Sequence, residues 1–192
     1  MSKTLNKKDT LVVNLYGGPG AGKSTNAAAL FVELKNRGIN CELVREYAKD
    51  LVWEERSVEF YDQFTVLGKQ VKRVNALIGK VDIIITDSPI ILSCHYNTLH
   101  NKQCFDKIVL DLHNTYKNLD VVVSRQKGYN PKGRFQTEEQ AKEIDREVTL
   151  MLREYGINHI IFKPQEQSIA SLADLAMKLQ KCQGITNNTP TK

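Results

Sequence analysis

The sequence lacks the two kinds of segment that direct a chain into or across a membrane. No stretch approaches the roughly 18 consecutive apolar residues that a membrane-spanning helix needs. Residues 1–10 are polar and contain lysine, unlike the apolar centre of a secretory signal. We therefore expect a cytoplasmic protein that has no membrane partner.

Cysteine is also scarce, and its spacing argues against two further classes. The sequence has four cysteines that lie far apart: Cys41, Cys94, Cys104 and Cys182. This spacing is typical neither of a disulfide framework nor of a zinc ribbon, so we expect reduced thiols. The guanine-recognition pattern Asn-Lys-x-Asp occurs once, at residues 6–9, ahead of the first predicted strand, and no copy follows any of the predicted strands, which argues against a GTPase. The net charge of +5 suits a protein that handles phosphates and permits, without requiring, a nucleic-acid partner.

One glycine-rich stretch dominates what the sequence does contain. Residues 17–24 read Gly-Gly-Pro-Gly-Ala-Gly-Lys-Ser and match the phosphate-loop pattern Gly-x-x-x-x-Gly-Lys-Ser/Thr at every fixed position. Glycines let successive N–H groups turn toward an anion, Lys23 carries a cation to the β- and γ-phosphates, and the Ser24 hydroxyl can join a Mg²⁺ shell. We therefore predict that the chain binds a nucleoside triphosphate. The predicted binding residues are Gly17, Gly18, Pro19, Gly20, Ala21, Gly22, Lys23, Ser24 and Thr25.

The chain alternates short apolar runs with amphipathic helical patterns. We predict five strands, at residues 11–16, 39–44, 81–86, 119–124 and 159–162. We predict helices at residues 24–35, 57–80, 101–117, 137–155 and 166–180, with shorter helical stretches ending near residues 53 and 96. This alternation is typical of an α/β domain, in which helices cover both faces of a five-stranded parallel sheet. We expect that domain at residues 10–182, a flexible basic leader at residues 1–9 and a disordered tail at residues 183–192.

In a parallel sheet the residues that follow the strands meet at one edge, where ligands bind. Asp87 directly follows the most apolar predicted strand and is expected to hold Mg²⁺ together with Ser24, although an Asp there can also cap the next helix. Glu46 follows the second strand and could take a proton from an attacking hydroxyl or hydrogen-bond an acceptor. The alternative for Glu46 is a surface pair with Arg45 or Lys49.

Two further segments are candidates for the site. Gln63, with Asp62 beside it, opens the predicted long helix and could bind the acceptor, or could lie on a solvated polar face. Residues 125–136 form a polar loop after the fourth strand, and its Gly and Pro content favours a lid over a plain surface loop. A lid would bring cations onto the phosphates and exclude water. Its cations are Arg125, Lys127, Lys132 and Arg134.

The motifs together resemble a known group of enzymes. The resemblance rests on residues 17–25, 45–49, 86–89 and 129–134 with the helix that follows, and it extends over most of residues 10–180. On these residues the chain resembles the nucleoside and nucleotide kinase branch of the phosphate-loop proteins. It is also similar to small phage-encoded ATPases that share the AAA-type domain of bacterial nicotinamide riboside kinases.

This resemblance implies a fold and a set of roles. The fold would be a three-layer P-loop NTP hydrolase fold, a five-stranded parallel sheet with helices on both faces and a lid, using ATP and Mg²⁺. Glu46 matches the carboxylate that acts as base in related nucleoside kinases. The implied catalytic residues are Lys23, Glu46, Asp87, Arg125 and Arg134, and the implied acceptor-binding residues are Arg45, Glu46 and Gln63.

The resemblance leaves three alternatives for the acceptor. The leading one is a small nucleoside or nucleotide, although Ser88-Pro89 stands where deoxynucleoside and thymidylate kinases place an arginine, which argues against those substrates. Related phage kinases phosphorylate hydroxymethylated bases in DNA, and here Lys69, Lys72 and Arg73 could then contact backbone phosphates. The third alternative is a regulatory ATPase that has no acceptor.

Overall fold

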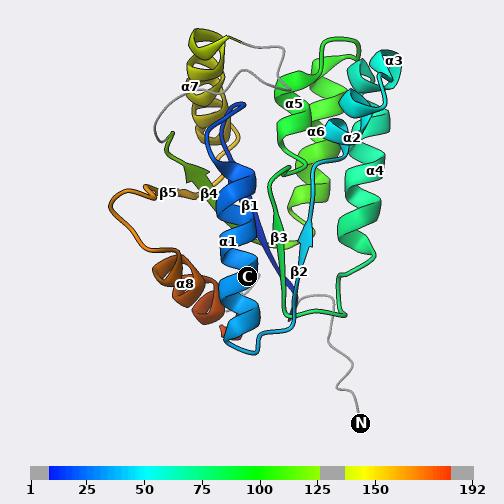
Figure 1. Ribbon diagram of the computed structural model, residues 1–192. Helices are drawn as coiled ribbons and strands as arrows, with labels where there is room; N and C mark the ends of the chain where they lie inside the picture. Colours follow the sequence, from blue (N-terminus) through cyan, green and yellow to red (C-terminus); the bar gives the residue numbers. More distant parts are fainter. Residues whose placement is uncertain (1–8, 126–136, 183–192) are drawn as a thin grey trace, which may run out of the picture.

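The computed structural model describes residues 9–125 and 137–182 of the chain. Its strands form one parallel sheet in the order β2-β3-β1-β4-β5 (Figure 1). The strands are β1 (Leu11–Tyr16), β2 (Cys41–Val44), β3 (Ile83–Thr86), β4 (Lys117–Val123) and β5 (His159–Phe162). A parallel sheet with helices between its strands was the predicted class, and this prediction is confirmed.

Helices connect these strands. They are α1 (Lys23–Asn36), α2 (Tyr47–Trp53), α3 (Ser57–Tyr61), α4 (Gln63–Asn75), α5 (Leu92–Tyr96), α6 (Lys102–His113), α7 (Glu138–Glu154) and α8 (Ile169–Lys181). A capping box at Thr137 and Gln140 opens α7, with both of its hydrogen bonds formed. None of the described helices is both long and apolar enough to cross a membrane.

Alternation along β1 separates the two helical layers. Leu11, Val13 and Leu15 point to the face that α1 and α8 cover, and each is at most 1% exposed. Val12 and Tyr16 point to the opposite face, which α4, α5, α6 and α7 cover (Figure 1). Side chains of a strand alternate between faces, so a strand that is apolar at nearly every position is buried on both sides. The fold is therefore a three-layer α/β P-loop NTPase fold.

The sequence predicts one helix over residues 57–80, and this prediction is wrong. The structure divides the segment into α3 and α4 and ends α4 at Asn75. Asp62 stands at the break with an extended backbone, and its carboxylate accepts the N–H of Phe64 at 3.1 Å. An Asp that caps a new helix competes with continuation of the old one. The apolar spacing continues across the break, so periodicity alone does not reveal it.

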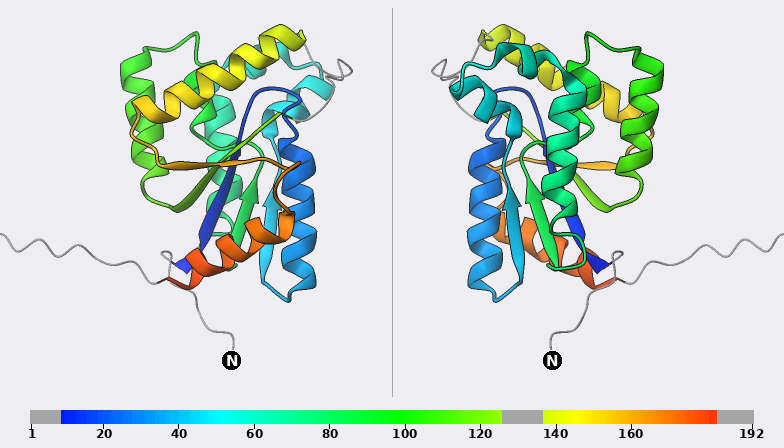
Figure 2. Two further views of the ribbon diagram at one scale, coloured as in Figure 1. Left: turned by 90° about the vertical axis from the view of Figure 1, so that its left-hand side faces the viewer. Right: turned by 90° about the vertical axis from the view of Figure 1, so that its right-hand side faces the viewer.

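The carboxyl ends of the strands meet at one end of the sheet. β1 lies at the centre of the sheet, and the loop of residues 17–22 leaves it there. Helices α2, α3 and α7 lie across the same end (Figure 2). This arrangement brings segments that are far apart in the sequence around the phosphate loop.

A buried polar network joins β1 to β4 below this edge. The Asp120 carboxylate accepts hydrogen bonds from the Asn14 amide at 3.1 Å and from the Tyr16 hydroxyl at 2.8 Å. His113 of α6 lies 3.5 Å from the same carboxylate, and its side chain is 4% exposed. Burial and the carboxylate of Asp120 raise the pKa of Tyr16 well above its ordinary value, so its hydroxyl stays protonated and donates. The network fixes the strand that leads into the phosphate loop.

We expect Asp120→Ala to lower the free energy of unfolding by about 3 kcal/mol, because it leaves buried donors without their acceptor. The control is Asp174→Ala, since Asp174 pairs with Arg37 while its side chain is 72% exposed. That surface pair should contribute less than about 1 kcal/mol. Urea unfolding measures both values, and equal losses in the two variants would contradict the role given to the network.

Candidate active site

The phosphate loop is shaped by glycine backbone and by the start of α1. Gly22 caps α1 with a φ of 96°, a left-handed conformation that favours glycine, and no side chain caps the helix. The first turn of α1 contains no acidic residue. The N–H groups of that turn and the positive end of the helix dipole are therefore suited to binding an anion.

Lys23 already lies on the loop that it is predicted to serve. Its ammonium donates to the carbonyl of Gly17 at 2.6 Å and to that of Gly18 at 3.0 Å. Burial lowers the pKa of Lys23, while the carboxylates of Glu46 and Asp87 act in the opposite direction. An ammonium that is held by neutral carbonyls near two carboxylates is well suited to exchange those partners for phosphate oxygens.

The back of the loop is held by α7. The Asp145 carboxylate accepts the N–H of Gly18 at 2.6 Å and the Nε–H of Arg125 at 2.7 Å. A Cβ atom at Gly18 would lie 2.5 Å from the carbonyl oxygen of Ala141, so only glycine fits between the loop and α7. The loop therefore depends on a helix that lies far along the chain.

Arg125 lies between the phosphate loop and α7. Its NH2 group donates to the carbonyl of Pro19 at 3.0 Å and to that of Ala141 at 3.1 Å. Its NH1 group is buried and has no hydrogen-bond partner among the described residues. Arg125 thus holds the phosphate loop against α7, and its role at the phosphates stays a prediction. The sequence contained no signal for its partner Asp145 beyond a charged position in an amphipathic helix.

Glu46 and Asp87 are neighbours at the ends of β2 and β3. The Glu46 N–H donates to the Asp87 carboxylate at 3.2 Å, and Asp87 is 6% exposed. Burial raises the pKa of Glu46, Lys23 lowers it, and Asp87 raises it further. Gln70 of α4 supports the same turn by accepting the N–H of Tyr47 at 3.2 Å. Sequence reasoning missed Gln70, whose position in the helix gives no sign of this contact.

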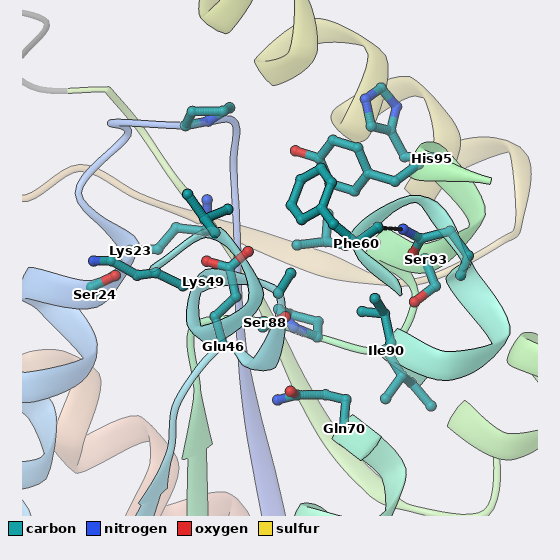
Figure 3. A pocket seen from close by; sticks show the side chains of 18 of the residues that line it. Lys23, Ser24, Glu46, Lys49, Phe60, Gln70, Ser88, Ile90, Ser93 and His95 are labelled. Atoms are coloured by element: carbon teal, nitrogen blue, oxygen red, sulfur yellow. Dashed lines mark hydrogen bonds between the residues drawn. The ribbon is translucent and has the colours of Figure 1, made fainter. Parts of the chain in front are cut away.

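A cavity of about 570 Å³ opens beside the loop. One half is lined by residues of the phosphate loop, and the other by residues of α2, α3, α5 and the start of α4. Figure 3 shows Glu46 between Lys23 and Ser24 on one side and Phe60 and Ser93 on the other. The structure therefore gives Glu46 a position between a phosphate-binding surface and a second, largely apolar compartment.

The predicted site residues are only partly brought together. Ser24, Glu46 and Gln63 line the cavity with several loop residues, whereas Arg45 is exposed and is not among the described lining residues. Arg134 and the other predicted lid cations, Lys127 and Lys132, lie outside the described residues. On α4, Lys69 and Lys72 are exposed, whereas Arg73 pairs with Asp50 at 2.7 Å.

The donor set fits the metal that the fold implies. Mg²⁺ prefers hard oxygen ligands and usually binds through one or two protein groups, with the remaining ligands supplied by phosphates and water. Ser24 offers a hydroxyl at the start of α1, and Asp87 offers a carboxylate at the end of β3. No cluster of three or more His, Cys, Asp or Glu side chains that could hold a metal alone occurs in the described part of the chain. Ser24 and Asp87 are the residues that would hold Mg²⁺.

Comparison with known sequences identifies the family. The pattern that defines the AAA domain family matches residues 12–168, most of the chain. The chain belongs to the AAA domain family. The match runs from β1 through the phosphate loop and α7 to the segment after β5, so the site described above lies within the AAA domain. No curated protein sequence matches the chain.

Solved structures show the same fold. A deoxyadenosine kinase from M. mycoides, solved with dCMP and dCDP, is 17% identical and aligns with a TM-score of 0.51 over 87% of this AAA domain chain and 97% of its own. An APS kinase from Mycobacterium tuberculosis is 14% identical, with a TM-score of 0.46, over 90% of this chain and 99% of its own. The alignment with the deoxyadenosine kinase supports a three-layer α/β P-loop NTPase fold for this chain.

We expect Asp145→Asn to weaken ATP binding by about tenfold, because it removes the charge that joins Gly18 to Arg125. Isothermal titration with ATP and Mg²⁺ measures the dissociation constant. Glu154→Gln, an exposed change on the same helix, is the matched control and should leave ATP binding unchanged. Equal ATP affinity in the two variants would contradict a role for Asp145 in shaping the loop.

Proposed function

We propose that this AAA domain is an ATP-dependent kinase that transfers the γ-phosphate to a hydroxyl of a nucleoside- or nucleotide-type acceptor. The observation that carries the proposal is the position of Glu46, which lies between the phosphate loop and the second half of the same cavity. A carboxylate between donor and acceptor surfaces is where phosphoryl transfer to a hydroxyl needs a base. ATP is proposed as the donor, rather than GTP, because residues 17–25 and 45–49 resemble those of nucleoside and nucleotide kinases.

The loop residues account for the donor side. Lys23 would exchange its two backbone carbonyl partners for β- and γ-phosphate oxygens, and the N–H groups of the loop and α1 would bind the remaining oxygens. When bound by Ser24 and Asp87, Mg²⁺ supplies charge that offsets the phosphate oxygens. Asp145 and Arg125 hold the loop in shape without touching the acceptor.

Glu46 accounts for the acceptor side. It would remove the proton of the acceptor hydroxyl as that oxygen attacks the γ-phosphorus. The bond between the γ-phosphorus and the bridging oxygen breaks, and its electron pair leaves with ADP. Burial raises the pKa of Glu46, which makes it a stronger base than an exposed glutamate. The backbone contact with Asp87 holds Glu46 in position.

The second half of the cavity favours a kinase over a regulatory ATPase. Hydrolysis requires a water molecule and no acceptor compartment, yet the cavity of about 570 Å³ extends from the phosphate loop past Glu46 to α2, α3 and α5. Small-molecule sites have this size and this mixture of apolar walls with few polar groups. The compartment is therefore best explained as an acceptor site.

The direct test is transfer of labelled γ-phosphate from ATP with Mg²⁺ to panels of nucleosides, nucleotides, and plain or hydroxymethylated DNA. We expect labelled small-molecule product, a loss of ATP binding in Lys23→Ala, and at least a hundredfold lower turnover in Glu46→Gln. The matched control is Glu42→Gln, because Glu42 lies on β2, the strand that precedes Glu46, and pairs with Lys35 instead.

Each other outcome identifies a different function. Label in DNA alone would replace the small acceptor with a base in a polymer. Hydrolysis of ATP that no member of the panels stimulates would contradict the kinase assignment and indicate a regulatory ATPase. Full activity in Glu46→Gln would remove Glu46 from the mechanism.

The turnover rate should depend on pH through Glu46. A base works only when it is deprotonated, so turnover falls as pH falls through its pKa. Burial raises the pKa of Glu46 above its ordinary value of 4.5, so the acid limb should lie at higher pH than for an exposed glutamate. A pH profile of kcat measures this limb. The limb should vanish in Glu46→Gln, and its persistence there would assign it to another group.

A further inference from the structure

The second half of the cavity, which lies beyond Glu46 from the phosphate loop, is lined mainly by apolar and aromatic side chains. Its walls carry the apolar side chains of Val52, Ile90 and Leu92 and the rings of Trp53, Phe60 and Tyr61. These residues come from α2, α3, α5 and the turn before α5, and none comes from the phosphate loop. In the proposed kinase, the phosphates of ATP would occupy the half beside the phosphate loop. The chemistry of the other half then indicates which kind of acceptor it binds.

Two of these rings are largely exposed to solvent, so packing in the hydrophobic core does not account for them. Trp53 is 69% exposed and Tyr61 is 59% exposed, although both line the cavity. Phe60 and Tyr61 lie edge to face, with ring centroids 5.4 Å apart. Exposed aromatic surface at a cavity is typical of a site that binds a flat group, because a second ring stacks on it and removes it from water.

The charges in the cavity do not suit a second phosphate. Among the described residues that line it, the permanent cations are Lys23, which lies on the phosphate loop, and Lys49, which is exposed. Burial lowers the pKa of His95, so its imidazole is neutral at physiological pH. The acceptor compartment is otherwise lined by neutral polar groups such as Gln63 and Ser93. Among the described residues, a phosphate dianion bound there would have the exposed Lys49 as its cation and no guanidinium, although phosphates are usually bound by several such groups.

Glu46 gives an independent argument on the same point. Its carboxylate lies at the junction of the two halves and would repel an acceptor phosphate (Figure 3). A phosphate acceptor also reaches the site already deprotonated and gains nothing from a base. A hydroxyl acceptor does need one.

We propose that the acceptor is a neutral molecule with a flat aromatic ring and a free hydroxyl, that it carries no phosphate, and that Trp53, Phe60 and Tyr61 bind its ring. This inference rests on the proposed kinase function and narrows its acceptor from nucleosides and nucleotides to unphosphorylated nucleoside-type compounds. It assigns the choice of acceptor to α2 and α3, outside the phosphate loop.

The sequence offers a direct probe of this compartment. Trp53 is the sole tryptophan of the chain, so its fluorescence reports on the cavity without any chemical step. The full chain is titrated with purine and pyrimidine nucleosides, with their 5′-monophosphates and with ribose, each in the presence of ADP and Mg²⁺. We expect at least one nucleoside to quench Trp53 saturably, with a dissociation constant at least tenfold lower than that of its monophosphate. Ribose should leave the fluorescence unchanged.

A variant pair tests the contribution of the rings. Tyr61→Ala should weaken nucleoside binding by about tenfold, because it removes a ring on which the base can stack. The affinity for ATP should stay unchanged, because Tyr61 belongs to α3 and not to the phosphate loop. Ile108→Ala is the control, since Ile108 is 44% exposed on α6 and does not line the cavity. Thermal melting verifies that both variants are folded.

Several results would overturn the inference. These are monophosphate binding as tight as nucleoside binding, equal binding of ribose, no saturable quenching by any nucleoside, or unchanged nucleoside affinity in Tyr61→Ala. The outcomes for the proposed function remain separate, because the titration measures binding without transfer. Phosphoryl transfer to monophosphates would keep the kinase assignment and reject the neutral acceptor. Nucleoside binding without transfer would keep the compartment and reject the kinase.

Discussion

The carboxylate of Asp145 is the contact on which the shape of the site depends. It receives the N–H of Gly18, 127 residues away, and the guanidinium of Arg125 through bonds of 2.6 and 2.7 Å. Such short bonds to a charged acceptor are among the stronger hydrogen bonds in proteins. Arg125 in turn donates to the carbonyl of Pro19. Helix α7 and the residue that follows β4 by two positions therefore hold adjacent residues of the phosphate loop. The loop is thereby organised before a nucleotide arrives.

Around that loop, burial shifts the pKa values of two charged groups, Lys23 and Glu46. Lys23 rests on backbone carbonyls, and burial lowers its pKa while nearby carboxylates raise it. Glu46 is held through its backbone by Asp87, which leaves its carboxylate directed at the cavity. Burial raises the pKa of Glu46 for the same reason that it lowers that of Lys23, since both charges lose hydration. In the proposed reaction, the donor and the acceptor would therefore meet at groups whose pKa values are shifted by burial.

Much of the fold could be predicted from the sequence, and the failures have definite causes. The five strands were found because apolar runs that are buried on both faces are local signals. The helix over residues 57–80 was wrong because Asp62 ends one helix and caps the next without interrupting the apolar spacing. The contacts of Arg125 with Asp145 and Ala141 were not foreseen, because its charge and its position after β4 do not indicate which helix it meets.

The sequence by itself determined the phosphate loop, the ions that suit it and the candidate base, because glycine conformations, helix starts and strand ends are set by neighbouring residues. Only the tertiary structure decided that Asp145 of α7 supports the loop, that Gln70 of α4 supports the turn before α2, and that exposed rings of α2 and α3 line the cavity beside the loop. These contacts join residues far apart in the chain. They follow from strand order and helix packing, which no local pattern of residues encodes.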